Sequence, residues 1–282
     1  MKKKSKVIAI AAPTATGKSK LAVELAHKID GEIISADSRL VYKGFEIAVA
    51  KPTIEEKEGI PHYLIDVVEP EFDYSVANYV DDATNAIEDI LSRGKTPIIV
   101  GGTGLYFRIL LEGYDVPRVA PNEELRKGLE EKTYDELLEI LKSLDEKIVA
   151  EIKEASKRKL IRTIEICKGL NKPLSEISMQ KEPPYEVEWI GINLKRDEIY
   201  DRINKRVDKM VEMGLVEETK KLLEIHGRIP NFVKTIGYQE ILQYLDGEIS
   251  FESAIELLKQ HTRNYAKRQL TWFRRNKALG ID

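Results

Sequence analysis

The chain has 282 residues, a net charge of -3 and an isoelectric point near 6.0. This length is enough for one large domain or two smaller ones, and the charge excludes a protein that is basic over its whole surface, although it allows a local basic surface. The single cysteine, Cys167, excludes an intramolecular disulfide and a thiolate metal cluster, and it indicates a cytoplasmic protein. No segment reaches the roughly eighteen apolar residues of a membrane span, so we expect no membrane partner.

The first predicted element is a buried strand that leads into a phosphate-binding loop. Residues 6–11 (KVIAIA) are nearly all apolar, which is typical of a parallel strand buried on both faces. The segment 12–19 (APTATGKS) follows, and apolar residues then recur at helical spacing. In this order of strand, loop and helix, backbone amides face an anion, Lys18 supplies a positive charge and the Ser19 hydroxyl can reach a metal ion. We therefore expect a group with at least two phosphates here; the alternative is a strand, turn and helix with an incidental Gly-Lys-Ser.

A second apolar run, residues 32–36 (EIISA), predicts a strand that ends at Asp37 and Ser38. Ligands bind at the carboxyl edge of open parallel sheets, so we expect Asp37 to lie beside the phosphate loop. The residues alone leave three roles open for Asp37: a group of the binding site, a cap of a turn or helix, and an outer-sphere partner of Mg²⁺.

Three further elements lead to a glycine-rich loop. Residues 62–67 (HYLIDV) predict a strand, residues 75–91 a helix, and residues 96–100 (TPIIV) another buried strand. The segment 101–104 (GGTG) then lets the backbone approach a ligand closely, and Thr103 adds a hydroxyl. Together with the first loop, this segment points to one predicted site.

The composition changes after the glycine-rich loop. Residues 117–185 are rich in Glu, Lys, Leu and Ile with helical periodicity, and residues 189–194 (WIGINL) predict a return to the sheet. We therefore predict a core of residues 1–116 and 187–282 and an inserted helical domain of residues 117–186. Inside the insertion, a basic cluster is either a solvated helix face or a contact for a polyanion: Lys157, Arg158, Lys159 and Arg162.

Two C-terminal helices carry clustered cations. On the helix predicted over 198–213, Arg202 and Arg206 lie four residues apart and project from one flank, where they form either a phosphate clamp or ordinary surface charge. No acidic residue occurs between Leu258 and Ile281. Cations and aromatic residues interleave in this tail: Lys259, Arg263, Tyr265, Lys267, Arg268, Trp272, Phe273, Arg274, Arg275 and Lys277. This combination neutralises nucleic-acid phosphates and stacks on bases; the alternative is a closing helix whose aromatic residues pack into the core.

Several stretches together resemble one family, the bacterial tRNA dimethylallyltransferases, which prenylate the N6 amine of an adenosine next to the anticodon. These stretches occur in the family's order and cover nearly the whole chain outside the insertion: 12–19 (APTATGKS), 31–38 (GEIISADS), 50–52 (AKP), 62–66 (HYLID), 74–79 (YSVANY), 100–106 (VGGTGLY), 202–210 (RINKRVDKM), 236–240 (IGYQE) and 263–275 (RNYAKRQLTWFRR). With the elements above, the resemblance implies an α/β fold. Its P-loop NTPase-like parallel sheet is flanked by helices, with an inserted small helical domain and a helical C-terminal tail.

The resemblance also implies a role for each residue of the site. The reaction displaces pyrophosphate from an allylic carbon by an aromatic amine, so the leaving group must be stabilised and the amine must lose a proton. Asp37, Thr103 and Arg206 are the implied catalytic residues, with Asp37 as the general base. The implied diphosphate-binding residues are Pro13, Thr14, Ala15, Thr16, Gly17, Lys18 and Ser19. Ser19 is also the implied ligand of a Mg²⁺ cofactor.

The implied substrates are dimethylallyl diphosphate and the anticodon stem-loop of a tRNA, whose target base flips out of its stack. The implied tRNA-binding residues are Ser38, Arg39, Leu40, Lys159, Arg162, Arg263, Lys267, Arg268, Gln269, Trp272 and Arg274. Although proteins of this family are commonly described as ATP-binding, the resemblance implies that the loop binds a prenyl diphosphate and that no ATP is needed. We expect a monomer.

The chain departs from the family's pattern at six positions. It has Ala12 for Gly, Leu40 for Gln, Ala48-Val49 for Gly-Thr, and Ser156 and Lys159 for Asp and Arg. The substitutions at 40, 48 and 49 remove hydrogen-bonding capacity where the family places the target nucleoside. Three alternatives therefore stay open: prenylation of free AMP, ADP or ATP, a P-loop kinase of a small metabolite, and a tRNA-binding paralogue with little catalysis.

Overall fold

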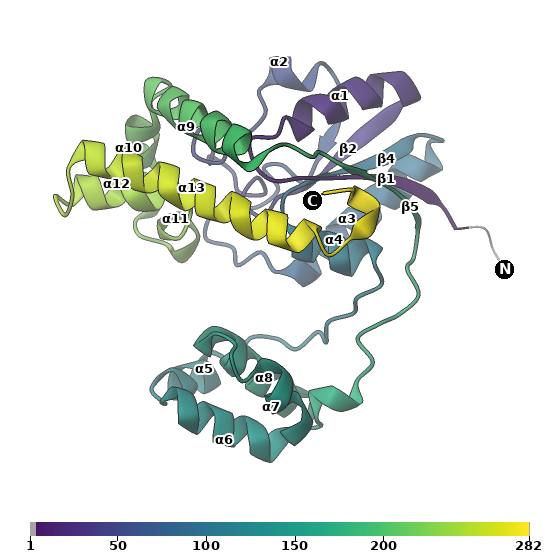
Figure 1. The fold of residues 1–282 in the computed structure, drawn as a ribbon, viewed down its shortest axis with the longest axis vertical. Coiled ribbons are helices and arrows are strands. Elements are labelled where there is room, and N and C mark those ends of the chain that lie inside the picture. Colours follow the sequence, from purple (N-terminus) through teal and green to yellow (C-terminus); the bar gives the residue numbers. More distant parts are fainter. Residues whose placement is uncertain (1–3, 282) are drawn as a thin grey trace. The chain divides into compact units, whose positions relative to one another are not determined.

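The computed structural model describes residues 4–281 of the chain. The described chain divides into two units, one formed by the residues up to Glu112 and from Pro184 onward, and the other by Gly113–Pro183 (Figure 1). The helical insertion predicted at 117–186 thus begins and ends a few residues earlier in the structure. No helix within residues 4–281 is long and apolar enough to cross a bilayer.

The centre of the first unit is a parallel sheet of five strands in the order β3-β2-β4-β1-β5. The strands are β1 (Lys6–Ala11), β2 (Gly31–Ala36), β3 (His62–Tyr63), β4 (Thr96–Gly101) and β5 (Glu186–Gly191). The three central strands lie where the apolar runs predict them. This sheet and its covering helices confirm the predicted α/β class.

The two edge strands differ from the prediction. β3 ends at Tyr63, because Leu64 (φ 62°) and Asp66 (φ 56°) adopt left-handed backbone conformations that cannot continue a strand. β5 begins three residues before the predicted run and exposes Glu186 and Glu188. Lys6 of β1 pairs with Glu188 at 2.7 Å.

Helices cover both faces of the sheet. Ile8 and Ile10 of β1 pack with α1 (Lys18–Ile29) on one face, whereas Val7 and Ala9 pack on the other. This alternation follows from the two-residue period of a strand. The second face is covered by α3 (Val76–Ser92) and α4 (Gly104–Leu111), which Figure 1 shows opposite α1.

The C-terminal half of the first unit is helical. α13 (Phe251–Phe273), the longest of the described helices, packs on α9 (Arg196–Glu212), α12 (Tyr238–Leu245) and α4 and runs beside α9 in Figure 1. Its buried stripe includes Leu258, Ala266, Leu270 and Phe273. The remaining elements of this unit are α2 (Ile54–Lys57), α10 (Leu215–His226), α11 (Pro230–Val233) and the short 3-10 helix η2 (Lys277–Leu279).

The second unit is a helical domain with a core of its own. Its elements are α5 (Glu123–Glu130), α6 (Tyr134–Leu144), α7 (Glu146–Ile152), α8 (Lys157–Leu170) and the 3-10 helix η1 (Leu174–Glu176). Glu165 of α8 is buried and accepts hydrogen bonds from Arg126 Nε (2.9 Å) and from the Asn122 backbone amide (2.7 Å). These bonds tie the start of α5 to α8, since a buried carboxylate requires such partners.

Candidate active site

The loop between β1 and α1 is folded tightly around the Pro13 carbonyl. Thr16 Oγ1 donates a hydrogen bond to this oxygen (2.8 Å), and Lys18 Nζ donates to it across the loop (3.3 Å). Ala15 (φ 63°) and Gly17 (φ 88°) provide the two left-handed turns that carry the chain into the N-terminus of α1. The side chain of Lys18 therefore lies over the loop, and the helix begins where an anion would be held.

Ala12, the departure from the usual glycine, fits this loop without strain. Its side chain is fully buried, and its amide donates to the Gly101 carbonyl at the end of β4 (3.3 Å). Its φ is not among the positive values of the described residues, so a Cβ costs no backbone energy here. The substitution leaves the loop geometry intact.

Asp37 lies at the end of β2, against the glycine-rich loop that follows β4. The Thr103 amide donates to the Ala36 carbonyl (3.1 Å), and the Ser38 amide donates to Thr103 Oγ1 (3.2 Å). Asp37 Oδ1 accepts the amide of Arg39 (2.8 Å), so one carboxylate oxygen caps a turn. The close approach requires a glycine at 101, because a Cβ there would lie 2.1 Å from the Ala36 carbonyl oxygen.

The charges of Lys18 and Asp37 act on each other. Burial lowers the pKa of Lys18 to about 8, the Asp37 carboxylate opposes this shift, and the Arg206 guanidinium adds to it. Burial also raises the pKa of Tyr106 and of Tyr265, and Asp37 raises both further. Such effects weaken with distance, so these five side chains lie near one another.

The two arginines of α9 reach the phosphate loop. Arg206 Nη1 donates to Thr14 Oγ1 (3.3 Å), and burial lowers the pKa of its guanidinium. Arg202 Nη1 donates to the Thr16 carbonyl (3.4 Å), while its other terminal nitrogen pairs with Glu198 (2.7 Å). The helix therefore brings both cations to the loop from one flank, which is what their four-residue spacing indicates.

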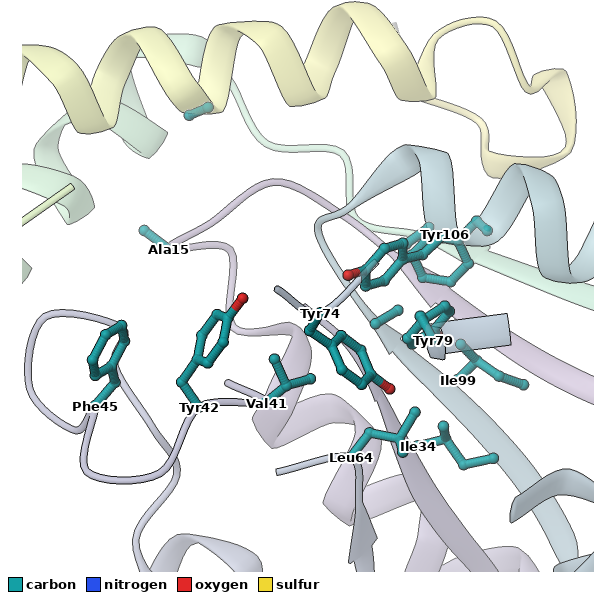
Figure 2. Close-up of a cluster of buried hydrophobic side chains, with 14 of the residues drawn as sticks. Ala15, Ile34, Val41, Tyr42, Phe45, Leu64, Tyr74, Tyr79, Ile99 and Tyr106 are labelled. Carbon is teal, nitrogen blue, oxygen red and sulfur yellow. The ribbon is translucent and has the colours of Figure 1, made fainter. Parts of the chain in front are cut away.

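Aromatic side chains pack beside the charged groups. Figure 2 shows Tyr42, Tyr74, Tyr79 and Tyr106 between the segment that carries Ala15 and the sheet. The rings of Tyr79 and Tyr106 stack with centroids 3.7 Å apart at 12°. The Tyr74 hydroxyl donates to Asp82 (2.7 Å), which fixes this ring as well. The sequence indicated none of these tyrosines as part of the site, because their grouping depends on tertiary packing.

The residues that replace the family's polar groups lie in segments held by hydrogen bonds and packing. Ala48 and Val49 are half-buried and pack on the main core. Glu218 of α10 accepts the amides of Ile47 (2.8 Å) and Ala48 (3.3 Å) and the hydroxyl of Tyr238 (2.6 Å). Leu40 is also half-buried, and its carbonyl accepts the amide of Asp66 (3.0 Å). Sequence reasoning did not find the role of Glu218, because the two amides that it binds lie about 170 residues away.

The cations of the tail have two kinds of surroundings. Lys259 pairs with Asp208 of α9 (2.8 Å), and Arg263 donates to Asn204 of the same helix (2.7 Å). These two cations therefore connect α13 to α9. Further along α13 and just beyond it, five cations are exposed: Lys267, Arg268, Arg274, Arg275 and Lys277. The guanidinium of Arg268 lies over the ring of Tyr265, 5.7 Å from its centroid.

Two predicted tRNA-binding residues of α13 face inward. Gln269 is buried, and both ends of its amide are hydrogen-bonded within the chain. Trp272 is half-buried and lies against Gly104, where a Cβ would come 2.5 Å from the indole ring. With Tyr265, these residues are spaced by four and then three, which places them on one face of the helix. That spacing is the signal that could have identified them as an inward face.

In the second unit, two predicted residues on α8 have different surroundings. Lys159 is exposed, whereas Arg162 is ion-paired with the buried Glu165 and donates to the Val119 carbonyl (2.9 Å). Ser156 caps α8 by accepting the Lys159 amide (3.4 Å). Serine and aspartate are both favoured caps, so this departure from the family's pattern preserves the helix.

A P-loop-like turn at the carboxyl edge of a parallel sheet, with one lysine, two arginines and an adjacent carboxylate, defines a P-loop-like α/β protein. The chain belongs to the IPP transferase family, whose family model matches residues 40–276. This finding confirms the resemblance seen in the sequence.

Relatives in sequence and in structure cover nearly all of the chain. A tRNA dimethylallyltransferase of Acetivibrio thermocellus is 47% identical over 277 residues, which are 95% of this chain and 88% of that protein. One of Thermomicrobium roseum is 44% identical over 285 residues, 99% of this chain and 86% of that protein. The crystal structure of a tRNA isopentenylpyrophosphate transferase from Bacillus halodurans matches with a TM-score of 0.74 and 42% identity, covering 99% of this chain and 90% of that one. A eukaryotic dimethylallyltransferase acting on tRNA matches with a TM-score of 0.84 and 32% identity, covering 95% of this chain and 70% of that one.

Proposed function

We propose that this protein transfers the dimethylallyl group of dimethylallyl diphosphate to the N6 amine of the adenosine next to the anticodon of tRNA, position 37, with release of pyrophosphate. The observation that carries this proposal is the meeting of a cationic phosphate loop, with Lys18 and Arg206, and the carboxylate of Asp37 in one site. The reaction needs these two features side by side. The family and the names of the relatives support the same reaction.

In the reaction, the bond between the allylic carbon and the diphosphate oxygen breaks while the bond from N6 to this carbon forms. The diphosphate leaves with the electron pair, and Lys18, Arg206 and the hydroxyl of Thr103 stabilise the charge that builds on it. The N6 proton passes to Asp37. Its Oδ1 is occupied by the Arg39 amide, which holds the carboxylate in a fixed orientation. General bases contribute about a hundred- to ten-thousand-fold in rate, equivalent to roughly 3 to 5 kcal/mol.

A magnesium ion fits the donor set of the site. Mg²⁺ prefers oxygen ligands and is commonly held by one or two protein groups together with substrate phosphates. Ser19, in the first turn of α1, offers a hydroxyl beside Lys18. No group of three His, Cys, Asp or Glu residues suited to a metal occurs within residues 4–281, so the diphosphate would supply most of the ligands. The ion would neutralise charge on the leaving group.

The tRNA is bound by its anticodon stem-loop, with the target base flipped toward Asp37. Ser38, Arg39 and Leu40 directly follow this carboxylate. The exposed cations Lys267, Arg268 and Arg274 on and after α13, and Lys159 on α8, contact backbone phosphates. The protein acts as a monomer in the cytoplasm, where its buried free Cys167 stays reduced.

The test is incubation with labelled dimethylallyl diphosphate, Mg²⁺ and unmodified tRNA whose anticodon loop has consecutive adenosines. We expect label in the RNA, on the adenosine next to the anticodon. Label in AMP, ADP or ATP instead would indicate a nucleotide prenyltransferase, and phosphorylation that depends on ATP would indicate a kinase. Retained tRNA binding without any transfer would indicate the paralogue with little catalysis.

The variant Asp37→Asn isolates the base, because the amide oxygen of asparagine still accepts the Arg39 amide. We expect the transfer rate to fall about a hundred- to ten-thousand-fold while tRNA affinity stays within about twofold. Unchanged turnover would remove Asp37 from the chemical step.

A further inference from the structure

Gln269 of α13 joins the two loops of the candidate active site. Its Oε1 accepts the amide of Thr14 in the phosphate loop (2.8 Å), and its Nε2 donates to the carbonyl of Gly102 in the glycine-rich loop (2.9 Å). The partners lie 255 and 167 residues away in the sequence, and the side chain is only 5% exposed. Both polar ends of the amide are therefore used inside the protein.

The glycine-rich loop follows the surface of α13 closely. A Cβ on Gly102 would lie 2.1 Å from Gln269 Nε2, and a Cβ on Gly104 would lie 2.5 Å from the ring of Trp272. Thr103, between these glycines, accepts the Ser38 amide through its side-chain oxygen (3.2 Å). Gln269 and Trp272 share one face of the helix, so residues 102–104 are packed against a fixed surface.

Thr14 is held from two sides. Gln269 binds its backbone amide, and Arg206 binds its hydroxyl (3.3 Å). A shift of this residue would therefore move both the loop amides and the contact that orients the Arg206 guanidinium. Since stabilisation of a leaving anion depends on donors that are already in place, this bridge bears directly on diphosphate binding.

We propose that Gln269 is a positioning residue that holds the phosphate loop and the glycine-rich loop in register around the diphosphate, and that it does not contact tRNA. The identity of the ligand rests on the proposed function. The exposed face of α13 carries Lys267 and Arg268, whereas its buried face carries Gln269, which holds the two loops of the diphosphate site.

The test compares Gln269→Leu, which removes both hydrogen bonds at similar size, with Gln269→Glu, which keeps the acceptor for Thr14 but loses the donor for Gly102. The probe is inorganic pyrophosphate with Mg²⁺, measured by calorimetry, with melting curves to establish that each variant is folded. We expect the dissociation constant to rise about tenfold to a hundredfold for the leucine variant, because it leaves a buried amide and carbonyl without partners. The glutamate variant should also bind more weakly, since its carboxylate faces the Gly102 carbonyl.

Thr271→Ala provides the matched control, because Thr271 is exposed on the same helix. It should leave pyrophosphate binding unchanged. In transfer assays, the Gln269 variants should raise the KM for dimethylallyl diphosphate, while tRNA affinity stays within about twofold. If the leucine variant does not fold, the glutamate variant alone decides.

Unchanged pyrophosphate affinity in a folded Gln269 variant would overturn the proposal, as would a larger loss of tRNA affinity than of pyrophosphate affinity. Failure of the wild-type protein to bind pyrophosphate would overturn it too. Wild-type protein that binds pyrophosphate but transfers no label to tRNA would refute the proposed function and leave the role of Gln269 standing.

Discussion

Raising the pH from 7 to 9 should weaken diphosphate binding through Lys18. Burial lowers the pKa of this ammonium to about 8, from an ordinary value near 10.5. That difference corresponds to roughly 3 kcal/mol of disfavoured charge in the free protein. A bound diphosphate would bring negative charge next to Lys18 and raise its pKa again, so ligand binding is coupled to proton uptake.

The direction and size of the change in diphosphate affinity follow from this coupling. Below pH 8 the free protein already carries the charge, and affinity should be nearly constant. Above pH 8 the proton must be taken up with the ligand, so affinity should fall by about tenfold between pH 7 and 9, given a pKa near 8. The Asp37 carboxylate raises the pKa of Lys18 and the Arg206 guanidinium lowers it, so the two groups act in opposite directions.

The assay is calorimetric titration with pyrophosphate and Mg²⁺ between pH 7 and 10, in buffers of different ionisation enthalpy that report the protons taken up. Lys18→Arg is the comparison, because a guanidinium keeps its charge throughout this range. Titration of the ligand itself is common to both proteins and cancels in the ratio of their affinities. Equal pH slopes for the wild type and Lys18→Arg, with no proton uptake above pH 8, would refute the reasoning.

Three further predictions concern RNA binding and stability. Lys267→Ala and Arg268→Ala should each weaken tRNA binding severalfold and reduce the salt slope of log affinity by about 0.7 to 0.9 per lost phosphate contact, whereas exposed Lys221→Ala on α10 should do neither. The hydrogen bond of Arg93 lowers the pKa of buried Glu32 to about 2. The wild type should therefore lose up to about 3 kcal/mol more free energy of unfolding than Glu32→Gln as the pH drops from 5 to 2, measured by denaturant titration. A parallel loss in both proteins would contradict this origin. Gly128 is exposed in the middle of α5, so Gly128→Ala should raise the free energy of unfolding by about 0.5 to 1 kcal/mol, because alanine favours a helix. Gly101→Ala should lower this free energy by about 1 to 3 kcal/mol, because the added Cβ would meet the Ala36 carbonyl.

The central strands and the phosphate loop could be predicted because their signals are local. β1 and β4 are continuous apolar runs, and each is followed by a segment rich in small residues. The edge strands were less predictable. β5 mixes exposed glutamates with half-buried apolar residues, and β3 is cut short by the left-handed conformation of Leu64. Neither property is visible as a hydrophobic period.

The candidate site was likewise predictable only in part. The Lys18 and Asp37 neighbourhood follows from a general rule, that parallel strands deliver their carboxyl ends to one edge. The inward direction of Gln269 does not, because which face of α13 is buried depends on contacts with loops more than 160 residues away. Likewise, Arg162 was expected at a tRNA surface, yet the buried carboxylate of Glu165 engages it.

The two margins of the sheet are poorly suited to pairing with another polypeptide. β3 offers only His62 and Tyr63 as a template, and β5 carries two exposed carboxylates, Glu186 and Glu188. Short edge strands and outward charges both prevent the edge-to-edge joining that leads to aggregates. An alanine pair at these glutamates would leave β5 as a smooth apolar margin, and the protein would then become prone to oligomerise as its concentration increases.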